Sequence, residues 1–145
     1  MSKEFLFTRI GYNYLPTTDI DGSISWYTEN LGLKLHTKFE ERGSFIAALH
    51  YPHKNAIAIV LIETRDCKPL RLVRNGEEFP VMAMNCTNID NTYQHLKGKG
   101  VEVGDINVLG EGTAKYFYFK DDQGNLLEAA WSKWDPVDDI KEDFT

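Results

Sequence analysis

One carboxylate, Glu128, stands among apolar residues in the segment KYFYFKDDQGNLLEAAW (115–131). An aromatic run leads to an Asp-Asp-Gln-Gly-Asn turn, and Glu128 follows in a second run with the composition of a strand. A carboxylate in apolar surroundings can ligate a metal ion, act as a general base, or hold the polar part of a bound molecule. A structural carboxylate, satisfied by tyrosines and backbone groups, is the remaining alternative.

Alternation along the strands predicts which side chains accompany Glu128. Side chains two positions apart share a face, so Glu128 should point the same way as Leu126 and Ala130. On the preceding strand Tyr116 and Tyr118 should share one face, and a hydrogen bond between Tyr118 and Glu128 is expected. Burial among aromatic rings would raise the pKa of the carboxyl group, whereas donors such as tyrosine hydroxyls would lower it.

Aromatic residues around these positions could line a cavity. Candidates for its walls or rim are Tyr12, Tyr14, Phe45, Tyr116, Tyr118 and Trp131. Aromatic rings offer large contact areas and tyrosine adds a polar tip, although ordinary core packing is the alternative for several of them. We predict a ligand site formed by Tyr12, Tyr14, Tyr116, Tyr118, Glu128 and Trp131, with Glu128 also the candidate catalytic residue. Alternation places Asn13 on the face opposite Tyr12, but a bulge in the strand would exchange the two.

The chain contains an internal repeat with an offset of 69 residues. Thr18-Asp-Ile-Asp21 is echoed by Thr87-Asn-Ile-Asp90, and each opens a segment with apolar residues at helical spacing. Thr18 and Thr87 are predicted to cap the first turns, with Asp21 and Asp90 as capping-box acids. Both helices are predicted to end at a glycine, in Leu-Gly-Leu and Lys-Gly-Val.

A strand-like run precedes each predicted helix, and three follow it. In the first half these runs are residues 6–15, 34–41, 44–51 and 56–63; in the second half they are residues 79–85, 101–109, 114–121 and 126–131. Turn-forming residues separate them. The pattern predicts one α+β domain of two βαβββ modules, residues 5–63 and 79–131, with a polar connection at 64–78 and an acidic tail at 132–145.

Two long segments carry a resemblance to a known family. YLPTTDIDGSISWYTENLGLKL (14–35) is similar to a Pro-Val-x-Asp-Leu-x-x-Ser-x-x-Phe-Tyr-x-x-x-Leu-Gly run, and YFYFKDDQGNLLEAAW (116–131) to a Phe-x-Asp-Pro-Asp-Gly-Asn-x-x-Glu run. Both runs are typical of the vicinal oxygen chelate superfamily, which includes glyoxalase I, extradiol dioxygenases, and fosfomycin- and bleomycin-resistance proteins. The resemblance implies two modules related by a pseudo-two-fold axis, with their strands in a cupped sheet and the helices outside. Tyr118 then falls where fosfomycin-resistance proteins have a substrate-contacting tyrosine.

Metal-dependent members of this superfamily draw ligands from four symmetry-related positions on the first and last strands of the modules. The resemblance places these positions at Tyr12, Ile59, Val81 and Glu128. Valine and isoleucine have no donor atom and a neutral tyrosine is a poor ligand, whereas a divalent metal needs at least three protein ligands. We therefore expect no cofactor, with one divalent metal as the alternative. His50 and His53, in His-Tyr-Pro-His, are interpreted as turn residues that could bind a metal only adventitiously.

Composition and charge limit the partners and the location. The 145 residues are 42% hydrophobic and 26% charged, with a net charge of −6 and a pI of about 5.2. These values argue against nucleic acid and anionic membranes as partners and favour neutral or cationic small molecules. The start, MSKEFLF, lacks a long apolar run, and Cys67 and Cys86 have no CxxC spacing. A cytoplasmic protein with reduced thiols is expected.

These observations lead to one predicted function and one alternative. The resemblance implies a metal-independent small-molecule-binding protein similar to the bleomycin-resistance branch, acting as a homodimer. The alternative is a metal-dependent lyase, isomerase or dioxygenase of the same superfamily that uses Glu128. Whether a reaction is catalysed, and whether the modules pair within one chain or between two, is left open by the sequence.

Overall fold

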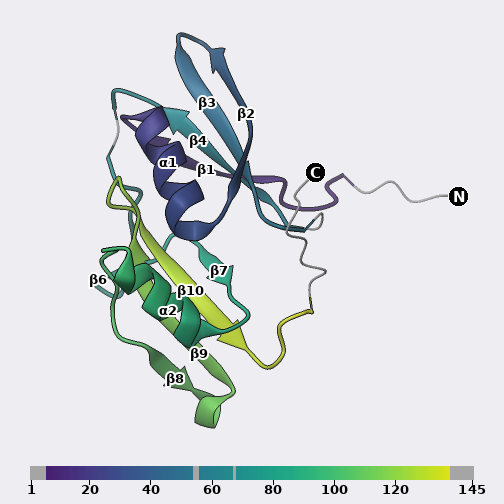
Figure 1. The fold of residues 1–145 in the computed structure, drawn as a ribbon, viewed down its shortest axis with the longest axis vertical. Helices are drawn as coiled ribbons and strands as arrows, with labels where there is room; N and C mark the ends of the chain where they lie inside the picture. The colour runs from purple at the N-terminus through teal and green to yellow at the C-terminus, as the bar shows by residue number, and fades with distance from the viewer. Residues whose placement is uncertain (1–5, 54–55, 67, 138–145) are drawn as a thin grey trace, which may run out of the picture.

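The computed structural model describes residues 6–53, 56–66 and 68–137, which form two similar units in succession (Figure 1). The first unit consists of β1 (Tyr12–Thr17), α1 (Ile20–Leu31), β2 (Lys34–Glu41), β3 (Ser44–His50) and β4 (Ala58–Glu63). The second consists of β7 (Ala83–Asn85), α2 (Ile89–Gly98), β8 (Asn107–Leu109), the 3-10 turn η1 (Gly110–Gly112), β9 (Ala114–Lys120) and β10 (Leu126–Ser132). A hairpin of β5 (Leu72–Arg74) and β6 (Glu77–Phe79) joins them.

Each unit contains one four-stranded sheet with the same strand order. The orders are β1-β4-β3-β2 and β7-β10-β9-β8. In both sheets the first and last strands of the unit pair in parallel, and the other pairs are antiparallel. The predicted α+β fold of two βαβββ modules is therefore confirmed.

The two helices begin one residue later than predicted. Asp19 and Asn88, not Thr18 and Thr87, are the N-caps: both have extended backbones, and their side chains accept hydrogen bonds from amides of the first turn. Aspartate and asparagine suit this position because their short side chains reach those free amides. Asp21 consequently lies two residues after its cap rather than three, so the predicted capping box does not form.

Glycine ends both helices, as predicted. Gly32 is the C-cap of α1 and has a left-handed backbone with φ of 73°. In α2 the C-cap is Lys99, and Gly100 follows it with φ of 81°. Such angles suit glycine because it has no Cβ atom to clash. Both helices are short, and within the described residues no helix is long and apolar enough to cross a membrane.

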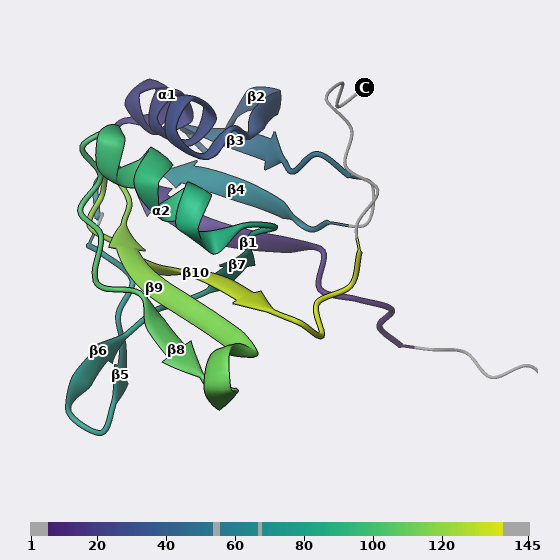
Figure 2. The same cartoon turned by 60° about the horizontal axis from the view of Figure 1, so that its bottom comes forward.

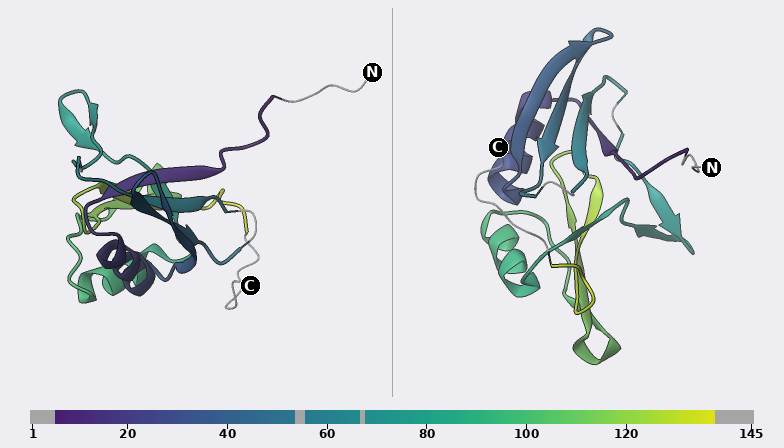
Figure 3. Two further views of the ribbon diagram at one scale, coloured as in Figure 1. Left: turned by 90° about the horizontal axis from the view of Figure 1, so that it is seen from above. Right: turned by 90° about the vertical axis from the view of Figure 1, so that its right-hand side faces the viewer.

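Each sheet has one face covered by helix and one open face. In β9 and β10, Phe117, Phe119 and Leu127 are almost completely buried, whereas the side chains between them are only half-buried. The same alternation occurs in β1, where Leu15 is buried and Tyr14 is 62% exposed. Both helices lie on one side of the molecule, and the β5-β6 hairpin projects from the other (Figure 3). The open faces of both sheets therefore look away from the helices.

Asn13 lies on the helix-covered face, because β1 contains no bulge. The strand pairs with β4 without a break in register, so Tyr12 points to the open face and is 60% exposed. The Asn13 amide donates to the sulfur of Met82 at 3.4 Å. This contact places the β1 edge of the first sheet beside the segment that enters β7. Figure 2 shows the β5-β6 hairpin projecting beyond the second sheet, on the side of the molecule away from α1.

The polar connection predicted at 64–78 contains most of a β-hairpin. β5 pairs with β6 in antiparallel register, and Asn75 and Gly76 form the turn with φ of 52° and 83°. Two successive positive φ angles define the type I′ turn that Asn-Gly favours between strands. Phe79, which the sequence places in the first strand of the second module, instead ends β6, and β7 begins only at Ala83.

Three predictions concern residues outside the described part of the chain. They are the start of the first module at residue 5, the thiol of Cys67 and the acidic tail beyond residue 137. The described beginning of the tail turns back on β10: the Ser132 amide and hydroxyl donate to the Asp135 carboxylate at 2.9 and 2.8 Å. The tail therefore starts with a tight turn.

A buried polar cluster joins the turn between β9 and β10 to α1. The Asp121 carboxylate, on a residue 7% exposed, accepts hydrogen bonds from the Tyr27 hydroxyl at 2.6 Å and the Asn125 amide at 2.8 Å. Two backbone amides of the turn also donate to it, and Ser23 Oγ donates to Asp122 at 2.5 Å. A buried carboxylate is stable only when donors surround it. We call these residues (Ser23, Tyr27, Asp121 and Asp122) the α1–turn contact; it ties the two units together.

Candidate functional site

Glu128 lies on the open face of the second sheet. Within β10 it stands opposite Tyr118 of β9 on one side and Ala83 of β7 on the other. Tyr116, two residues before Tyr118, points to the same face. The structure thus brings together three predicted site residues, Tyr116, Tyr118 and Glu128, through alternation along two paired strands.

The two tyrosines form an aromatic surface that the β5-β6 hairpin extends. The ring centroids of Tyr116 and Tyr118 are 5.5 Å apart with planes at 34°, and the Phe79 ring meets Tyr118 at 6.3 Å and 72°. The Arg74 guanidinium lies 5.4 Å from the centre of the Phe79 ring. We call Phe79, Tyr116, Tyr118 and Glu128 the tyrosine face. Sequence reasoning misses Phe79 because it assigns this residue to the next strand.

The Glu128 carboxylate is half-buried and has no hydrogen-bond partner among the described residues; the bond expected from the Tyr118 hydroxyl is not formed. Burial alone raises the pKa of Glu128 above its ordinary value. The pKa of Tyr118 is also raised, first by burial and then by Tyr116 and the Glu128 charge, while Arg74 acts in the opposite direction. A carboxylate in this position would gain from a bound molecule that brings a positive charge or a donor.

The remaining predicted site residues lie elsewhere. Tyr12 and Tyr14 are on the open face of the first sheet, and within the described structure neither ring contacts the tyrosine face. Trp131 lies on the helix-covered face, where it packs against the core. Its placement follows from alternation, because a residue three positions from Glu128 points the opposite way. Phe45 also packs against the core, from β3, so neither it nor Trp131 belongs to the tyrosine face.

The strand register corrects one of the four positions compared with family metal ligands. Glu128 pairs with Ala83, whose counterpart 69 residues earlier is Tyr14, and Tyr14 pairs with Val60. Val60, not Ile59, is therefore the counterpart of Glu128 in the first unit. The offset changes because the turn before the last strand is longer in the first unit. Ile59 is fully buried on the helix-covered face.

The four positions, with Val60 in place of Ile59, do not fit a resident divalent metal. Val60 and Val81 have no donor atom, which leaves the Tyr12 hydroxyl and the Glu128 carboxylate. A divalent metal in such a site needs at least three nitrogen, oxygen or sulfur ligands. In the part of the chain that the structure describes, no three His, Cys, Asp or Glu side chains gather closely enough to hold one. Metal independence stays a prediction that titration can test.

The ring of His50, at the end of β3, contacts the ring of His36 in β2, although the register pairs His50 with Lys34. The ring centroids are 4.4 Å apart with planes at 74°, and His36 lies at a register irregularity between Leu35 and Thr37. Burial and the neighbouring imidazole lower the pKa of His50, which favours its neutral form. Two imidazoles that lack a third ligand within the described residues do not form a metal centre.

Solved structures share this fold over most of their length. TnmS3, an antibiotic-binding protein from Streptomyces sp. CB03234, is 15% identical with a TM-score of 0.71, covering 90% of this chain and 100% of that chain. A glyoxylase/bleomycin resistance protein/dioxygenase domain from Frankia sp. EAN1pec is 19% identical with a TM-score of 0.70, covering 88% and 99%. The fosfomycin resistance protein FosX from Listeria monocytogenes is 14% identical with a TM-score of 0.68, covering 89% and 97%. These likenesses establish the fold.

Comparison at the sequence level identifies the family. No curated protein matches the chain. A family model matches residues 9–129, a span that includes both helices and most of β10. The same span contains the whole first βαβββ unit, the hairpin and all of the second unit except the end of β10. The chain therefore belongs to the Glyoxalase/Bleomycin resistance protein/Dioxygenase superfamily.

Proposed function

We propose that this protein binds a small molecule at the tyrosine face without a resident metal. The observation that carries the proposal is the half-buried Glu128 carboxylate, which lies beside the rings of Tyr116 and Tyr118 and has no hydrogen-bond partner among the residues that the structure describes. Burying a carboxylate without donors costs folding free energy, and a ligand that supplies a donor recovers part of it. A local arrangement that disfavours folding is typical of a binding site.

The tyrosine face suits a flat, cationic, aromatic molecule. The rings of Tyr116, Tyr118 and Phe79 offer stacking and edge contacts. The Glu128 carboxylate can accept a charge-assisted hydrogen bond from a protonated amine. The net charge of −6 also attracts cations to the surface as a whole. We therefore place the ring of the ligand on the tyrosines and its amine at Glu128.

Relatives in the superfamily support small-molecule binding. TnmS3 is an antibiotic-binding protein and FosX is a fosfomycin resistance protein, and both share this fold. We do not propose the alternative of a metal-dependent lyase, isomerase or dioxygenase, because the four positions, with Val60 in place of Ile59, supply too few ligands. Glu128, the candidate catalytic residue, is assigned to ligand binding instead.

We also propose that the protein acts as a cytoplasmic homodimer, as the sequence predicted. A row of exposed apolar side chains follows the N-terminal segment into β1: Leu6, Phe7, Ile10, Tyr12 and Tyr14. A second copy would remove this row from water. Analytical ultracentrifugation should give twice the 16.6 kDa mass of one chain. A monomer at all accessible concentrations would contradict this part of the proposal without affecting the tyrosine face.

Binding of 9-aminoacridine, a flat aromatic cation, tests the tyrosine face. We expect calorimetry on untagged, chelator-treated protein to show saturable binding that Glu128→Gln weakens by about tenfold, because the charge-assisted hydrogen bond is lost. Tyr118→Leu should weaken binding by a similar factor, because it removes the central ring. Glu40→Gln, at an exposed position in β2 of the other sheet, is the matched control and should bind like the wild type. Unchanged affinity in both Glu128→Gln and Tyr118→Leu would refute the assignment.

A metal titration tests the second half of the proposal. Chelator-treated protein titrated with Zn²⁺, Mn²⁺, Ni²⁺ and Fe²⁺ should show no tight stoichiometric site. One equivalent bound tightly, and lost in Glu128→Gln, would overturn metal independence and restore the enzymatic alternative. Weak binding lost in His36→Ala would locate an adventitious ion at the histidine pair and leave the proposal standing.

A further inference from the structure

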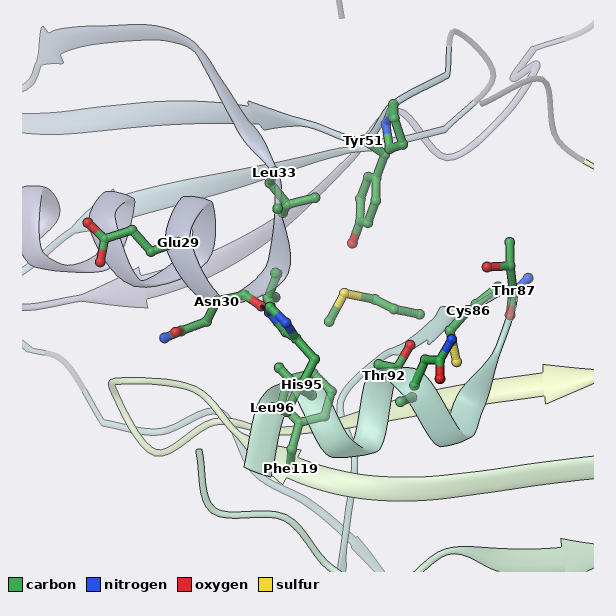
Figure 4. Close-up of a pocket in the computed structure, with 17 residues that line it drawn as sticks. Glu29, Asn30, Leu33, Tyr51, Cys86, Thr87, Thr92, His95, Leu96 and Phe119 are labelled. Carbon is green, nitrogen blue, oxygen red and sulfur yellow. Dashed lines mark hydrogen bonds between the residues drawn. The ribbon is translucent and has the colours of Figure 1, made fainter. Parts of the chain in front are cut away.

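A pocket of about 620 Å³ lies on the helix-covered side of the molecule (Figure 4). Its walls come from both units: the end of α1, the turn after β3, the end of β7 and one side of α2. Leu33, Leu96 and Phe119 are among its apolar lining, and Tyr51 extends its ring into the space between them. The volume lies within the range typical of small-molecule sites. We call this space the α2 pocket.

The α2 pocket occupies the position in the repeat that corresponds to the α1–turn contact. Ala48 in β3 is the counterpart of Tyr118 in β9, because each pairs with the equivalent residue of the last strand. Three residues further along the chain, Tyr51 is therefore the counterpart of Asp121. The 69-residue offset of the helices places Leu96 in α2 where Tyr27 lies in α1.

The side chains at these equivalent positions fill the space in the α1–turn contact but leave the α2 pocket open. In the α1–turn contact the fully buried Tyr27 donates its hydroxyl hydrogen to Asp121. In the α2 pocket the helix position is Leu96, which offers the Tyr51 hydroxyl no acceptor, and no other described residue forms a hydrogen bond with it. Burial raises the pKa of Tyr51, so its hydroxyl stays protonated and can donate.

We propose that the α2 pocket binds a second class of ligand: an uncharged, mainly apolar small molecule with an oxygen that accepts a hydrogen bond from Tyr51. Apolar walls favour hydrocarbon rings or chains. Of the described residues that line the pocket, none is Lys or Arg, and the His95 Nε2 atom already lies 3.0 Å from the Asn30 carbonyl oxygen. An anion would therefore lack a counter-charge, and the acidic Glu29 is exposed at the rim.

The α2 pocket and the tyrosine face lie back to back across the second sheet. Phe119 lines the pocket, whereas its neighbour Tyr118 in β9 points to the tyrosine face. In β10 Ala129 lines the pocket, whereas its neighbour Glu128 points to the tyrosine face. A substitution on one face should therefore leave the other site intact, so failure of one proposal can be told from failure of the other.

Prodan, a neutral naphthalene ketone with environment-sensitive fluorescence, is the probe we choose. We expect saturable, blue-shifted binding at least about tenfold tighter than binding of 6-dimethylamino-2-naphthoate, an anion of similar shape, because burying an unpaired charge is costly. Tyr51→Phe should weaken prodan binding by about 3- to 10-fold, the effect of one neutral hydrogen bond. Leu96→Tyr, which repeats the α1 arrangement in α2, should fill the pocket and abolish binding. Tyr118→Leu, on the opposite face, is the control and should not change it.

Alkylation of Cys86 gives a readout of where the probe sits, because this residue lines the same pocket. In Cys67→Ser protein, prodan at several times its Kd should slow the reaction of Cys86 with iodoacetamide by about fivefold, since only free protein reacts. The measurement needs mildly alkaline pH, because burial raises the pKa of this thiol. Binding that leaves Cys86 unprotected, that Tyr51→Phe does not weaken, or that Tyr118→Leu removes would overturn the proposal.

Discussion

The α1–turn contact and the α2 pocket occupy equivalent places in the two halves of one repeat, yet only the first is filled. In the first, Tyr27 and Asp121 form a buried hydrogen bond of 2.6 Å. In the second, Leu96 and Tyr51 take those positions, and a pocket of about 620 Å³ remains. The repeated backbone determines where a turn meets a helix. A few side chains determine whether that meeting is structural or leaves room for a ligand.

The open faces of the two sheets also carry different side chains at equivalent positions. On the first sheet the equivalent pair of first and last strands carries Tyr14 and Val60; on the second it carries Ala83 and Glu128. In the first pair Val60 is buried and Tyr14 is exposed, so the Tyr14 ring offers a surface that suits a second copy of the chain. The second places a carboxylate beside a small side chain, which leaves room for a ligand. Similar backbones thus carry different chemistry.

Among the substitutions that test this comparison, Asp121→Ala should lower stability the most, because it removes the acceptor at the centre of the α1–turn contact. The Tyr27 hydroxyl and the Asn125 amide would remain buried without partners, and we expect the free energy of unfolding to fall by about 3 kcal/mol. Urea denaturation measures this change. Asp105→Ala, at an exposed position, is the control and should change stability by less than about 0.5 kcal/mol. A loss below about 1 kcal/mol for Asp121→Ala would show that the contact does not hold the units together.

Removing the hydroxyl group of Tyr27 or of Tyr51 compares the α1–turn contact directly with the α2 pocket. Tyr27→Phe deletes the donor to Asp121 and should lower the free energy of unfolding by about 1.5 kcal/mol. Tyr51→Phe deletes a hydroxyl that no described residue bonds, so ligand-free protein should lose less than about 0.5 kcal/mol. The same urea titration measures both variants, and each serves as the control for the other. Equal losses would mean that the Tyr51 hydroxyl has a structural role and is not reserved for a ligand.

Much of the fold could be predicted because the repeat carries local signals for its own boundaries. The 69-residue offset located both helices to within about one residue at their starts, since capping residues and glycines mark their ends. Alternation along β9 and β10 placed Tyr116, Tyr118 and Glu128 on one face. The same rule already excludes Trp131 from that face, because its distance from Glu128 is odd. These features depend on neighbours in sequence, which is why the sequence reveals them.

The features that the sequence did not predict depend on register or on contacts between distant segments. The counterpart of Glu128 shifts from Ile59 to Val60 because two turns differ in length, which alternation within a strand cannot show. The strand expected at 101–109 shrinks to β8, since Val103 makes a single bridge to β9. The α2 pocket joins the end of α1, the turn after β3 and α2, and no local pattern connects them. The Asn-Gly pair at 75–76, by contrast, was a usable hairpin signal.

The smallest predicted effect concerns Asp122, at the edge of the α1–turn contact. Burial raises the pKa of this carboxyl group above its ordinary 3.8, and the hydrogen bond from Ser23 opposes the shift without cancelling it. Because the folded state then binds the proton more tightly than the unfolded chain, stability falls as the pH rises through the window between the two pKa values. Asp122→Asn keeps an acceptor for Ser23 but cannot ionise, so calorimetry should give a Tm about 1 °C above wild type at pH 7 and no difference near pH 3. Asp105→Asn should show no such pH-dependent difference. If instead the Tm of the wild type rises relative to that of Asp122→Asn as the pH rises, the Asp122 anion stabilises the α1–turn contact. The α1–turn contact and the α2 pocket would then differ in charge as well as in packing.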